Sequence, residues 1–378
     1  MTETLPQRAG RRRVLIMNWR DVAHPEGGGS ERYVESVGRR LAAAGWDVTL
    51  LCATHPGHRG WSERDGIRVR QVGGPRSVYL RGLLHLLRHR YDVVVDVQNG
   101  VPFWSRLVAR GPVVVLVHHV HREVWPVAVG PVAARIGWFL ESRMAPLVYR
   151  RCRYVTVSDA SRRDLVALGV QPERIDVVHN GTEAWAFPDA TRSDTPRLSV
   201  VGRLVPHKRV EHAVAAVARL APLHDVHLDV VGHGYWEDEI RRYAGELGVL
   251  DRVHFHGYVS DEQKHALLSA SWVHVCPSLK EGWGLVCVEA ARHGVPTVAY
   301  RAAGGVVESV RDGRTGYLVD DLDGLVDRIT TLIADADLGR QMGEQAREFA
   351  HGYSWDATSR RFAAVLDAVS GRLGQRSP

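Results

Sequence analysis

The chain has 378 residues, of which 45% are hydrophobic and 24% are charged. This length exceeds what one ordinary hydrophobic core serves and suits two domains, and the composition excludes a disordered chain. No apolar run approaches the roughly 20 residues that cross a bilayer, and the apolar stretch Val14–Met17 is too short for a signal-peptide core. We therefore expect a cytoplasmic protein.

The net charge of +6 is unevenly distributed. Residues 1–185 contain 27 Arg and no Lys against 17 acidic residues, whereas the remainder has four more acidic than basic residues. A basic first half indicates an anionic partner, such as a lipid head group, a membrane surface or a phosphorylated acceptor. An Arg-rich composition without a target explains the bias equally well. Nucleic acid fits poorly, because no basic stretch carries interleaved aromatic residues or a reading helix.

The first half alternates short β-branched runs with helical stretches. The expected strands are Val14–Asn18, Val48–Ala53, Ile67–Val72, Val93–Val97, Val113–His118, Tyr154–Ser158 and Ile175–His179. The expected helices are Glu31–Ala44, Val78–Arg90, Pro131–Arg150 and Ala160–Leu168. Continuous apolar strands that alternate with helices predict a parallel sheet covered on both faces.

A second series of the same kind follows the Pro-, Asp-, Thr- and Ser-rich stretch Asn180–Pro196, which we interpret as a linker. Its expected strands are Leu198–Val201, Val226–Val231, Val253–Phe255, Trp272–Cys276, Thr297–Tyr300 and Tyr317–Val319. Its expected helices are Val210–Leu220, Glu237–Leu247, Glu262–Ser269, Leu285–His293 and Leu325–Ala334, followed by Ser354–Val369. Two doubly wound domains predict a ligand crevice at the carboxyl ends of the strands, between the domains.

In the first half, Gly27, Gly28 and Gly29 lie between the first strand and the first helix. They match neither the dinucleotide fingerprint nor a P-loop, although such a turn still offers an anion pocket. Three histidines, at 118, 119 and 121, follow a later strand. A metal site there is a weak prediction because no carboxylate pair completes it, so we favour His118 as a polar or catalytic group that faces the crevice.

In the second half, Arg203 and Lys208 occupy the turn between a strand that ends at Gly202 and the next helix. The chain has only three lysines, the others being Lys264 and Lys280. A lysine retained among arginines indicates a site for a compact point charge, which suits phosphate. A solvent-exposed loop cation is the alternative.

The segment Glu281–Leu285 also leads from a strand into a helix. Its backbone N–H groups and the helix N-terminus are suited to a diphosphate, and Gly282 and Gly284 allow a ligand to approach closely. Glu289 follows in the helix, so the two carboxylates are placed to face opposite ends of one ligand. An ordinary helix carboxylate is the alternative for Glu289. Asp321 and Asp323 resemble a D-x-D metal motif, but helix N-capping is the better interpretation.

Together these motifs resemble the retaining glycosyltransferases of family 4, which have the GT-B fold. The matching segments of the second half are Gly202-Arg203 with Lys208, Pro277-Ser278, Glu281–Leu285 with Glu289, and Gly304-Gly305 with Glu308. Gly27–Glu31 and His118 fit in the first half, so the resemblance covers nearly the whole chain. The resemblance implies an α/β protein with two Rossmann-like, doubly wound domains that face an interdomain cleft. Residues 1–185 would bind the acceptor and residues 186–352 the nucleotide sugar, and residues 353–378 would form a helix that crosses back to the first domain.

The resemblance also implies a role for each matching position. Arg203 and Lys208 would neutralise the diphosphate in place of a divalent metal. Glu281 would hold the donor sugar and Glu289 the ribose. The remaining donor-site positions would be Gly202 and Gly232 at strand ends, Val259 by the base, His118 at the sugar, Gly28 and Gly29 by the phosphates or acceptor, and the backbone of Gly282, Trp283, Gly284 and Leu285. Most members have Phe where this chain has Trp283, which leaves the backbone role intact and changes the sugar pocket.

The implied reaction moves a hexose-type sugar from a UDP- or GDP-linked donor to an acceptor hydroxyl, with retention and without a metal or cofactor. A sugar-nucleotide epimerase is the alternative enzyme, and a non-catalytic sugar-nucleotide-binding module is a third interpretation. The nicotinamide dehydrogenases are disfavoured because the dinucleotide fingerprint is missing.

The acceptor is not readable beyond an anionic or lipid-linked class. In Val78–Arg90, four leucines share one face with arginines around it, which is typical of a membrane-surface helix but equally of a helix packed on its sheet. The apolar stretch Val124–Leu140 is expected to border the acceptor pocket. We therefore expect weak peripheral contact with anionic lipid at the inner membrane face. The four cysteines form no C-x-x-C pair and are expected to be reduced, mostly buried thiols.

Overall fold

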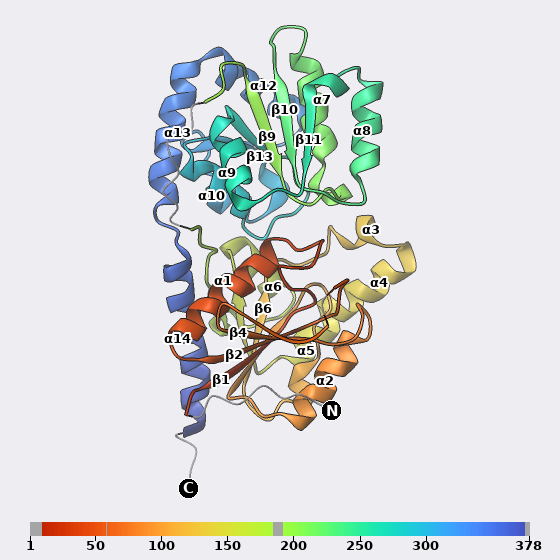
Figure 1. Cartoon of the computed structure of the whole chain (residues 1–378), viewed down its shortest axis with the longest axis vertical. Helices are drawn as coiled ribbons and strands as arrows, with labels where there is room; N and C mark the ends of the chain where they lie inside the picture. The colour runs from red at the N-terminus through yellow and green to blue at the C-terminus, as the bar shows by residue number, and fades with distance from the viewer. Residues whose placement is uncertain (1–9, 58, 184–191, 375–378) are drawn as a thin grey trace. The chain divides into compact units, whose positions relative to one another are not determined.

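The computed structural model describes residues 10–57, 59–183 and 192–374, in two compact units (Figure 1). The first unit contains the chain up to Trp125, Val129–Gly181 and the segment that begins at Trp355. The second contains Pro126–Ala128 and Thr182–Ser354. The domain boundary expected at residues 185 and 186 lies outside the described residues, as does the middle of the expected linker.

The first unit is built on an eight-stranded sheet with the order β3-β4-β2-β1-β5-β6-β7-β8. Its strands are β1 (Arg13–Met17), β2 (Asp47–Cys52), β3 (Gly60–Arg64), β4 (Ile67–Gln71), β5 (Val93–Val97), β6 (Val113–Val117), β7 (Arg153–Thr156) and β8 (Ile175–Val177). All neighbours are parallel except β3 and β4. The central strands are runs of buried Val, Leu and Ile, as a sheet covered on both faces requires.

Helices cover both faces of this sheet. They are α1 (Gly29–Ala43), α2 (Val78–Arg88), η1 (Ser105–Leu107), α4 (Pro131–Phe139), the π-helical turn η2 (Leu140–Met144), α5 (Ala145–Val148), α6 (Asp159–Ala167), η3 (Pro172–Arg174) and α14 (Trp355–Gly374). The short helix α3 (Trp125–Ala128) begins in the first unit and ends in the second. Figure 1 shows α2, α4 and α5 on one side of the sheet and α1 with α14 on the other. Tyr33 of α1 packs edge-on against Trp355 and Phe362 of α14, with ring centroids 5.8 and 6.1 Å away.

The second unit has a six-stranded, fully parallel sheet with the order β11-β10-β9-β12-β13-β14. Its strands are β9 (Arg197–Val201), β10 (His227–Val231), β11 (Val253–Gly257), β12 (Val273–Cys276), β13 (Thr297–Tyr300) and β14 (Gly316–Val319). Its helices are η4 (Pro206–Lys208), α7 (Val210–Leu220), α8 (Glu237–Glu246), η5 (Leu250–Arg252), α9 (Asp261–Ala270), α10 (Leu285–Arg292), η6 (Arg301–Ala303), α11 (Val306–Ser309), α12 (Leu322–Ala334) and α13 (Ala336–Ala350). All six carboxyl ends therefore lie along one edge of the sheet.

Three of the differences from the sequence-based expectations have a clear physical reason. Strand β3 was not expected, because its residues are largely polar and exposed and it pairs antiparallel at the sheet edge. Helix α13 was missed because its buried face consists mostly of small residues. The helix expected over Pro131–Arg150 is divided by η2, just before Pro146, whose ring nitrogen carries no N–H to continue the α-helical ladder.

Three other features are settled directly. All four cysteines are free and buried, as their spacing predicts. Asp321 caps α12 by accepting the Gly324 N–H at 2.8 Å, so the capping interpretation is confirmed. Within the described ranges, no helix is both long enough and apolar enough to cross a bilayer.

Candidate functional site

In the second unit, loops from neighbouring strands meet at the carboxyl edge of the sheet through close backbone contacts. A Cβ atom on Gly232, whose φ is +126°, would lie 2.0 Å from the carbonyl oxygen of Gly202. A Cβ atom on Gly305 would lie 1.9 Å from the carbonyl oxygen of Gly282. Glycine is therefore required at Gly232 and Gly305 so that the loops can touch each other, a packing reason that the sequence did not reveal.

Lys208 and Glu281 form an ion pair within this edge. Lys208 Nζ lies 2.5 Å from Glu281 Oε1, and the Ser278 hydroxyl donates to the same oxygen at 2.7 Å. The N–H of Leu279 donates to the carbonyl of His207 at 2.7 Å, which ties the loop after β9 to the loop after β12. Two segments 73 residues apart in sequence thus present one cation and one carboxylate together.

The Glu281 carboxyl is ionised in this setting. Burial alone raises its pKa, but the charge and hydrogen bond of Lys208, together with the Ser278 hydroxyl, outweigh burial and hold the pKa below its ordinary value. Only 17% of the Glu281 side chain is exposed, so little water competes for its oxygens. The carboxylate is thus held ready to accept hydrogen bonds from a ligand hydroxyl.

Arg203 differs from Lys208 in its partners. It lies half-buried in the same loop after β9. Among the residues that the structure describes, no carboxylate forms an ion pair with its guanidinium. An arginine next to a compensated lysine leaves uncompensated positive charge at this edge, which suits an anionic ligand.

Glu289 is held by another of the three lysines. Lys264 of α9 donates to Glu289 Oε1 at 2.8 Å, and both residues are buried. A buried charge is costly unless it is paired, and Lys264 supplies the opposite charge that keeps the Glu289 carboxylate inside the second unit. Sequence reasoning noted that Lys264 is one of three lysines but did not connect it with Glu289.

The loop that precedes α10 is shaped by Gly284. This residue has a φ of +84° and forms the N-cap of the helix that begins at Leu285. The Trp283 side chain is 1% exposed and packs against Tyr353, with ring centroids 4.8 Å apart. The indole is therefore part of the core of the second unit. Only the backbone of Trp283 is left to contact a ligand from the loop.

Val259 follows β11 and is half-buried. Its neighbour Tyr258 is 77% exposed and contacts the ring of His233 edge-on, with centroids 5.9 Å apart. Because His233 follows Gly232, this pair extends the same edge of the sheet to β10 and β11. An exposed tyrosine there offers a stacking surface for a base.

In the first unit, His118 lies just after β6 and is 7% exposed. Burial, followed by the nearby His121, lowers its pKa to about 4, so its ring is neutral at pH 7. The ring packs edge-on against Tyr33, with centroids 5.3 Å apart. Within the described chain, His118 Nε2 has no hydrogen-bond partner, and a buried polar atom of this kind is usually satisfied by a ligand or by water.

The neighbouring histidines have other partners. His121 Nδ1 lies 3.0 Å from Glu141 Oε1, and Trp125 Nε1 donates to the second oxygen of Glu141 at 2.7 Å. The ring of His119 lies against that of His121, with centroids 4.2 Å apart. Across the described ranges, no group of three or more His, Cys, Asp or Glu side chains is arranged to hold a metal ion.

The glycine turn before α1 is also engaged internally. The Gly28 N–H donates to Glu31 Oε2 at 2.8 Å, and the Gly27 N–H donates to the carbonyl of His24 at 2.8 Å. Gly29 begins α1, and a Cβ atom there would meet nothing within 4 Å. The open space lies beside Gly29, whereas the Gly28 N–H is already used.

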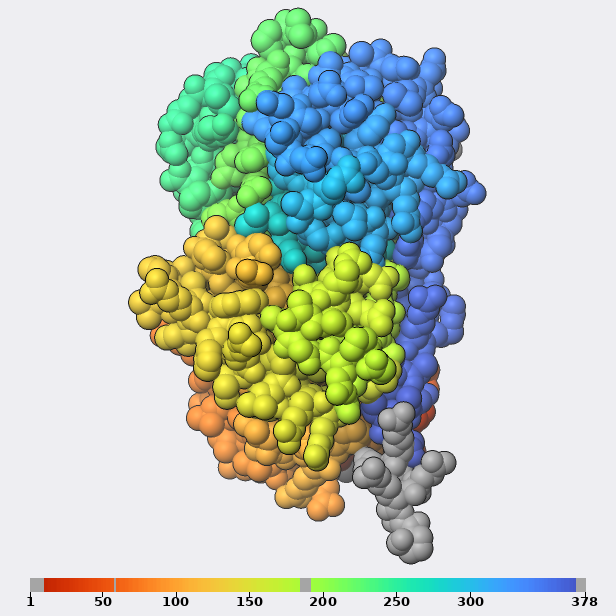
Figure 2. All heavy atoms as spheres, turned by 180° about the vertical axis from the view of Figure 1, so that it is seen from behind, coloured from red at the N-terminus to blue at the C-terminus, as the bar shows by residue number. Residues whose placement is uncertain are grey.

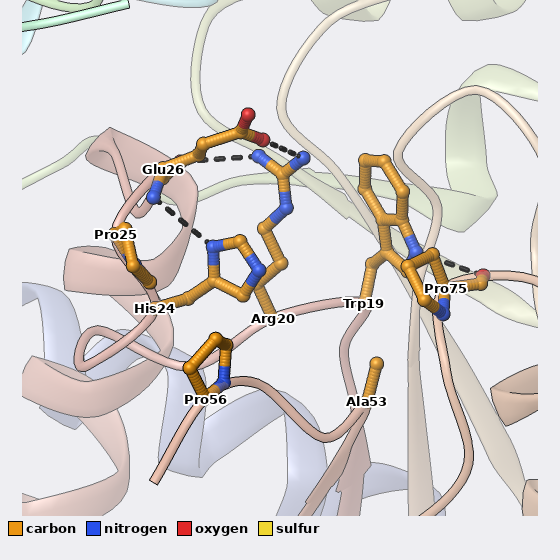
Figure 3. Close-up of a pocket in the computed structure, with 8 residues that line it drawn as sticks. All are labelled: Trp19, Arg20, His24, Pro25, Glu26, Ala53, Pro56 and Pro75. Carbon is orange, nitrogen blue, oxygen red and sulfur yellow. Dashed lines mark hydrogen bonds and ion pairs between the residues drawn. The ribbon is translucent and has the colours of Figure 1, made fainter. Parts of the chain in front are cut away.

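A cavity of about 370 Å³ lies beside this turn (Figure 3). It is lined by Trp19, Arg20, His24, Pro25, Glu26, Ala53, Pro56 and Pro75. Arg20 stacks over the Trp19 ring at 4.1 Å and forms an ion pair with Glu26. Burial, and then Arg20, lowers the pKa of His24, and its Nδ1 accepts the Glu26 N–H at 3.0 Å. The cavity thus combines apolar walls with a charge-balanced polar side.

Sequence reasoning missed the buried support of this cavity. Asp21 accepts hydrogen bonds from Gln71 at 2.9 Å and from Arg64 at 3.2 Å, and its other oxygen lies 3.1 Å from His55 Nε2. These contacts hold the loop after β1 against β3 and β4. Trp19 and Arg20 follow directly after an expected strand, and that position at a carboxyl end was the available signal.

Comparison with known proteins supplies independent information. Residues 182–349 match the family described as glycosyl transferases group 1, and residues 28–181 match the glycosyl transferase 4-like domain. The chain is 30% identical to the MMP alpha-(1->4)-mannosyltransferase of Mycolicibacterium hassiacum, over 96% of this chain and 99% of that protein.

Two solved structures share the fold at lower identity. A sucrose-phosphate synthase from Thermosynechococcus elongatus superposes with a TM-score of 0.82 at 22% identity, over 96% of this chain and all of that one. HepE of Anabaena, solved in complex with UDP-glucose, has a TM-score of 0.74 at 18% identity, over 94% of this chain and 99% of that one. Both units therefore have counterparts in known proteins.

Proposed function

Because this chain belongs to the group 1 glycosyltransferases, of the family 4 type and the GT-B fold, we propose that it transfers a hexose-type sugar from a UDP- or GDP-linked donor to an acceptor hydroxyl, with retention of anomeric configuration. Glycosyl transfer itself follows from the family. The sugar, the nucleotide, the stereochemistry and the independence from metal are parts of the proposal.

One observation carries the donor assignment, namely the Lys208–Glu281 ion pair beside Arg203. The second unit presents these groups at the carboxyl edge of its sheet, where parallel α/β folds bind their ligands. In the proposal Arg203 and Lys208 bind the diphosphate, and Glu281 accepts hydrogen bonds from the sugar. Glu289, oriented by Lys264, accepts hydrogen bonds from the ribose.

The proposed chemistry is a substitution on one face of the sugar. The bond between the anomeric carbon and the β-phosphate oxygen breaks, and its electron pair goes to the departing diphosphate. The acceptor oxygen bonds to the anomeric carbon on the same face, and its proton passes to the departing phosphate oxygen. Arg203 and Lys208 stabilise the negative charge that develops on the diphosphate, which is the contribution that a divalent metal makes in other enzymes.

The names of the relatives support the donor class. One relative is named as a mannosyltransferase that forms an alpha-(1->4) linkage, and one structural neighbour is described with UDP-glucose bound. Mannose and glucose are both hexoses, and UDP is a nucleoside diphosphate. His118, with its neutral ring and open Nε2, is proposed to contact the donor sugar. Gly29 is proposed to border the bound substrates.

For the acceptor we propose the cavity beside Trp19. A volume of about 370 Å³ falls at the small end of ligand pockets, which is suited to one sugar ring and its substituents. The indole and the prolines offer C–H contact surfaces, while Arg20, Glu26 and His24 offer donors and acceptors for hydroxyls (Figure 3). An anionic or lipid-linked acceptor, a cytoplasmic location and weak contact with the inner membrane face belong to the same proposal.

The test is a thermal-shift screen of nucleotide-diphosphate sugars, followed by product mass spectrometry and NMR of the anomeric centre. We expect one UDP- or GDP-hexose to raise the unfolding temperature, and its product to keep the α configuration in the presence of EDTA. An inverted product contradicts the mechanism, and loss of activity in EDTA contradicts metal independence. Conversion of donor to an isomer without any acceptor would indicate an epimerase instead.

A further inference from the structure

Helix α2 exposes leucines where a helix of a globular protein usually exposes polar residues. Leu80, Leu84 and Leu87 are 63%, 39% and 50% exposed. Their spacing of four and three residues places them on one stripe. The buried side of α2 consists of Val78, Gly82 and Leu86. The helix therefore packs on the sheet through a different stripe, and the three leucines face away from the sheet.

The helical segment α4–η2–α5 has a similar outer stripe. Val132, Ile136, Phe139 and Leu147 are 67%, 55%, 54% and 58% exposed. The spacing again follows helical periodicity, and the buried residues Ala134, Gly137, Glu141 and Ala145 lie between them. The first part of this segment belongs to the stretch Val124–Leu140 that was expected to border the acceptor pocket, and that expectation stays a prediction.

The two stripes face the same side of the first unit. Val78 and Leu86 of α2 and Ala145 of α5 belong to one core cluster with the strands β1, β5 and β6. Both helices therefore cover the same face of the sheet, and their outer stripes point away from it. Figure 2 shows residues 131–150 in yellow beside the orange segment that contains α2, on one continuous face of the unit. We call these seven exposed apolar side chains the outer apolar face.

Arginines surround the outer apolar face. They are Arg76, Arg81, Arg88 and Arg90 near α2, and Arg122, Arg135, Arg143, Arg150 and Arg151 near α4 and α5, all exposed. Among the described residues, none of them forms an ion pair with a carboxylate. The sequence contains no Asp or Glu between Gly73 and Tyr91, and of the two in 122–151 one is the buried Glu141. The face is thus apolar and cationic at once.

We propose that the outer apolar face is a docking surface for an anionic lipid bilayer. Apolar side chains interleaved with unpaired arginines match the head-group region, where the side chains enter the acyl boundary and the guanidinium groups meet phosphates. A protein partner is the less favoured occupant, because protein interfaces are enriched in aromatic residues and Met, whereas six of the seven side chains of this face are Leu, Val or Ile. The inference deepens the membrane contact of the proposed function and rests on it, but it concerns binding and not glycosyl transfer.

The test is co-sedimentation of the full chain with vesicles of phosphatidylcholine alone and of phosphatidylcholine with phosphatidylglycerol. We expect binding to the anionic vesicles at low salt and little binding to the neutral ones. Raising the salt to about 1 M shortens the Debye length from about 10 Å to about 3 Å and should weaken the binding. If the wild-type chain stays in the supernatant with anionic vesicles at low salt, the proposal is wrong.

Paired variants locate the surface. Leu80→Ser with Leu87→Ser, and Ile136→Ser with Phe139→Ser, should each weaken vesicle binding by about tenfold or more, because they remove apolar area from the interface. The matched control is Leu223→Ser with Leu250→Ser, two exposed leucines of the second unit. Arg81→Gln with Arg88→Gln should reduce the salt dependence, whereas Arg314→Gln with Arg361→Gln should not.

The outcomes separate this inference from the proposed function. Thermal unfolding should be unchanged in all these variants because the side chains are exposed, so a loss of binding is not a loss of folding. Equal binding by the wild type and both apolar variants overturns the proposal. Self-association of the free protein that the same variants abolish also overturns it, and assigns the face to a second copy. If the chain binds anionic vesicles but transfers no sugar, the docking surface is supported and only the proposed transfer reaction is contradicted.

Discussion

Lys264 Nζ lies 2.8 Å from Oε1 of Glu289, and both residues are buried in the second unit. The same arrangement recurs at 2.5 Å between Lys208 and Glu281. Two of the three lysines in an arginine-rich chain therefore pair with the two glutamates of the proposed donor site. A compact ammonium binds a carboxylate as a point charge, whereas a planar guanidinium often binds both carboxylate oxygens at once.

Replacement of Lys264 by Met should destabilise the protein. The change leaves the Glu289 carboxylate buried without its cation, and breaking a buried pair in this way costs about 3–5 kcal/mol. Urea denaturation measures this cost. Glu289→Gln in the same chain should recover part of it, because no charge is then left unpaired. A loss below about 1 kcal/mol for Lys264→Met would show that water already screens the pair.

Lys208→Ala should lower kcat by about 100- to 1000-fold, the usual effect of removing one group that stabilises a developing anion. Arg203→Ala should act in the same direction. Steady-state kinetics on the preferred donor measures both, and KM should change less than kcat because the charge is largest as the diphosphate leaves. Arg219→Ala, in an exposed pair with Asp323, is the control within the same unit. Unchanged turnover in both Lys208→Ala and Arg203→Ala refutes the donor site.

His118 should make the protein less stable as the pH falls. Its folded pKa of about 4 lies below the ordinary value of 6.5, so between these values the unfolded chain binds a proton that the folded chain does not. Stability is therefore lost as the pH decreases from about 6.5 to about 4. His118→Asn should reduce this dependence, as urea denaturation at pH 5 and pH 8 would show. An equal slope in both proteins means that the ring is solvated.

Gly232→Ala should disrupt the edge of the second sheet. Its Cβ would lie 2.0 Å from the Gly202 carbonyl oxygen, and its φ of +126° is strained for any other residue. We expect a destabilisation of more than about 2 kcal/mol and loss of donor binding. Gly245→Ala in α8 is the matched change, because its Cβ meets nothing within 4 Å and alanine favours a helix. If both variants unfold alike, the close approach of the two loops is not required.

The sequence predicted most of the strands well because a buried strand is a local feature. Runs such as Val93–Val97 reveal a buried strand by composition, and Arg203, Lys208 and Glu281 stand at strand ends where parallel sheets bind ligands. The pairing of Lys264 with Glu289 was missed because it joins two helices, α9 and α10. Periodicity showed that α2 is amphipathic but could not decide which stripe meets the sheet. Of the four leucines on the expected face, Leu80, Leu84 and Leu87 are exposed, whereas Leu83 is half-buried.

Trp19→Ala should weaken binding of the acceptor and leave binding and hydrolysis of the donor unaffected. The indole walls the cavity beside Arg20, so its loss removes the C–H contact surface for a sugar ring. Saturation-transfer NMR with methyl α-D-mannopyranoside and methyl α-D-glucopyranoside as probes should show transfer to the wild type and little to the variant. Trp61→Ala is the matched control, because Trp61 also stacks with an arginine, Arg70 at 5.1 Å, but lines no part of the cavity. Once the acceptor is known, its KM should rise about tenfold in Trp19→Ala, while slow hydrolysis of the donor stays constant. If transfer to the acceptor and hydrolysis of the donor are lost together, Trp19 supports the fold and does not bind the acceptor.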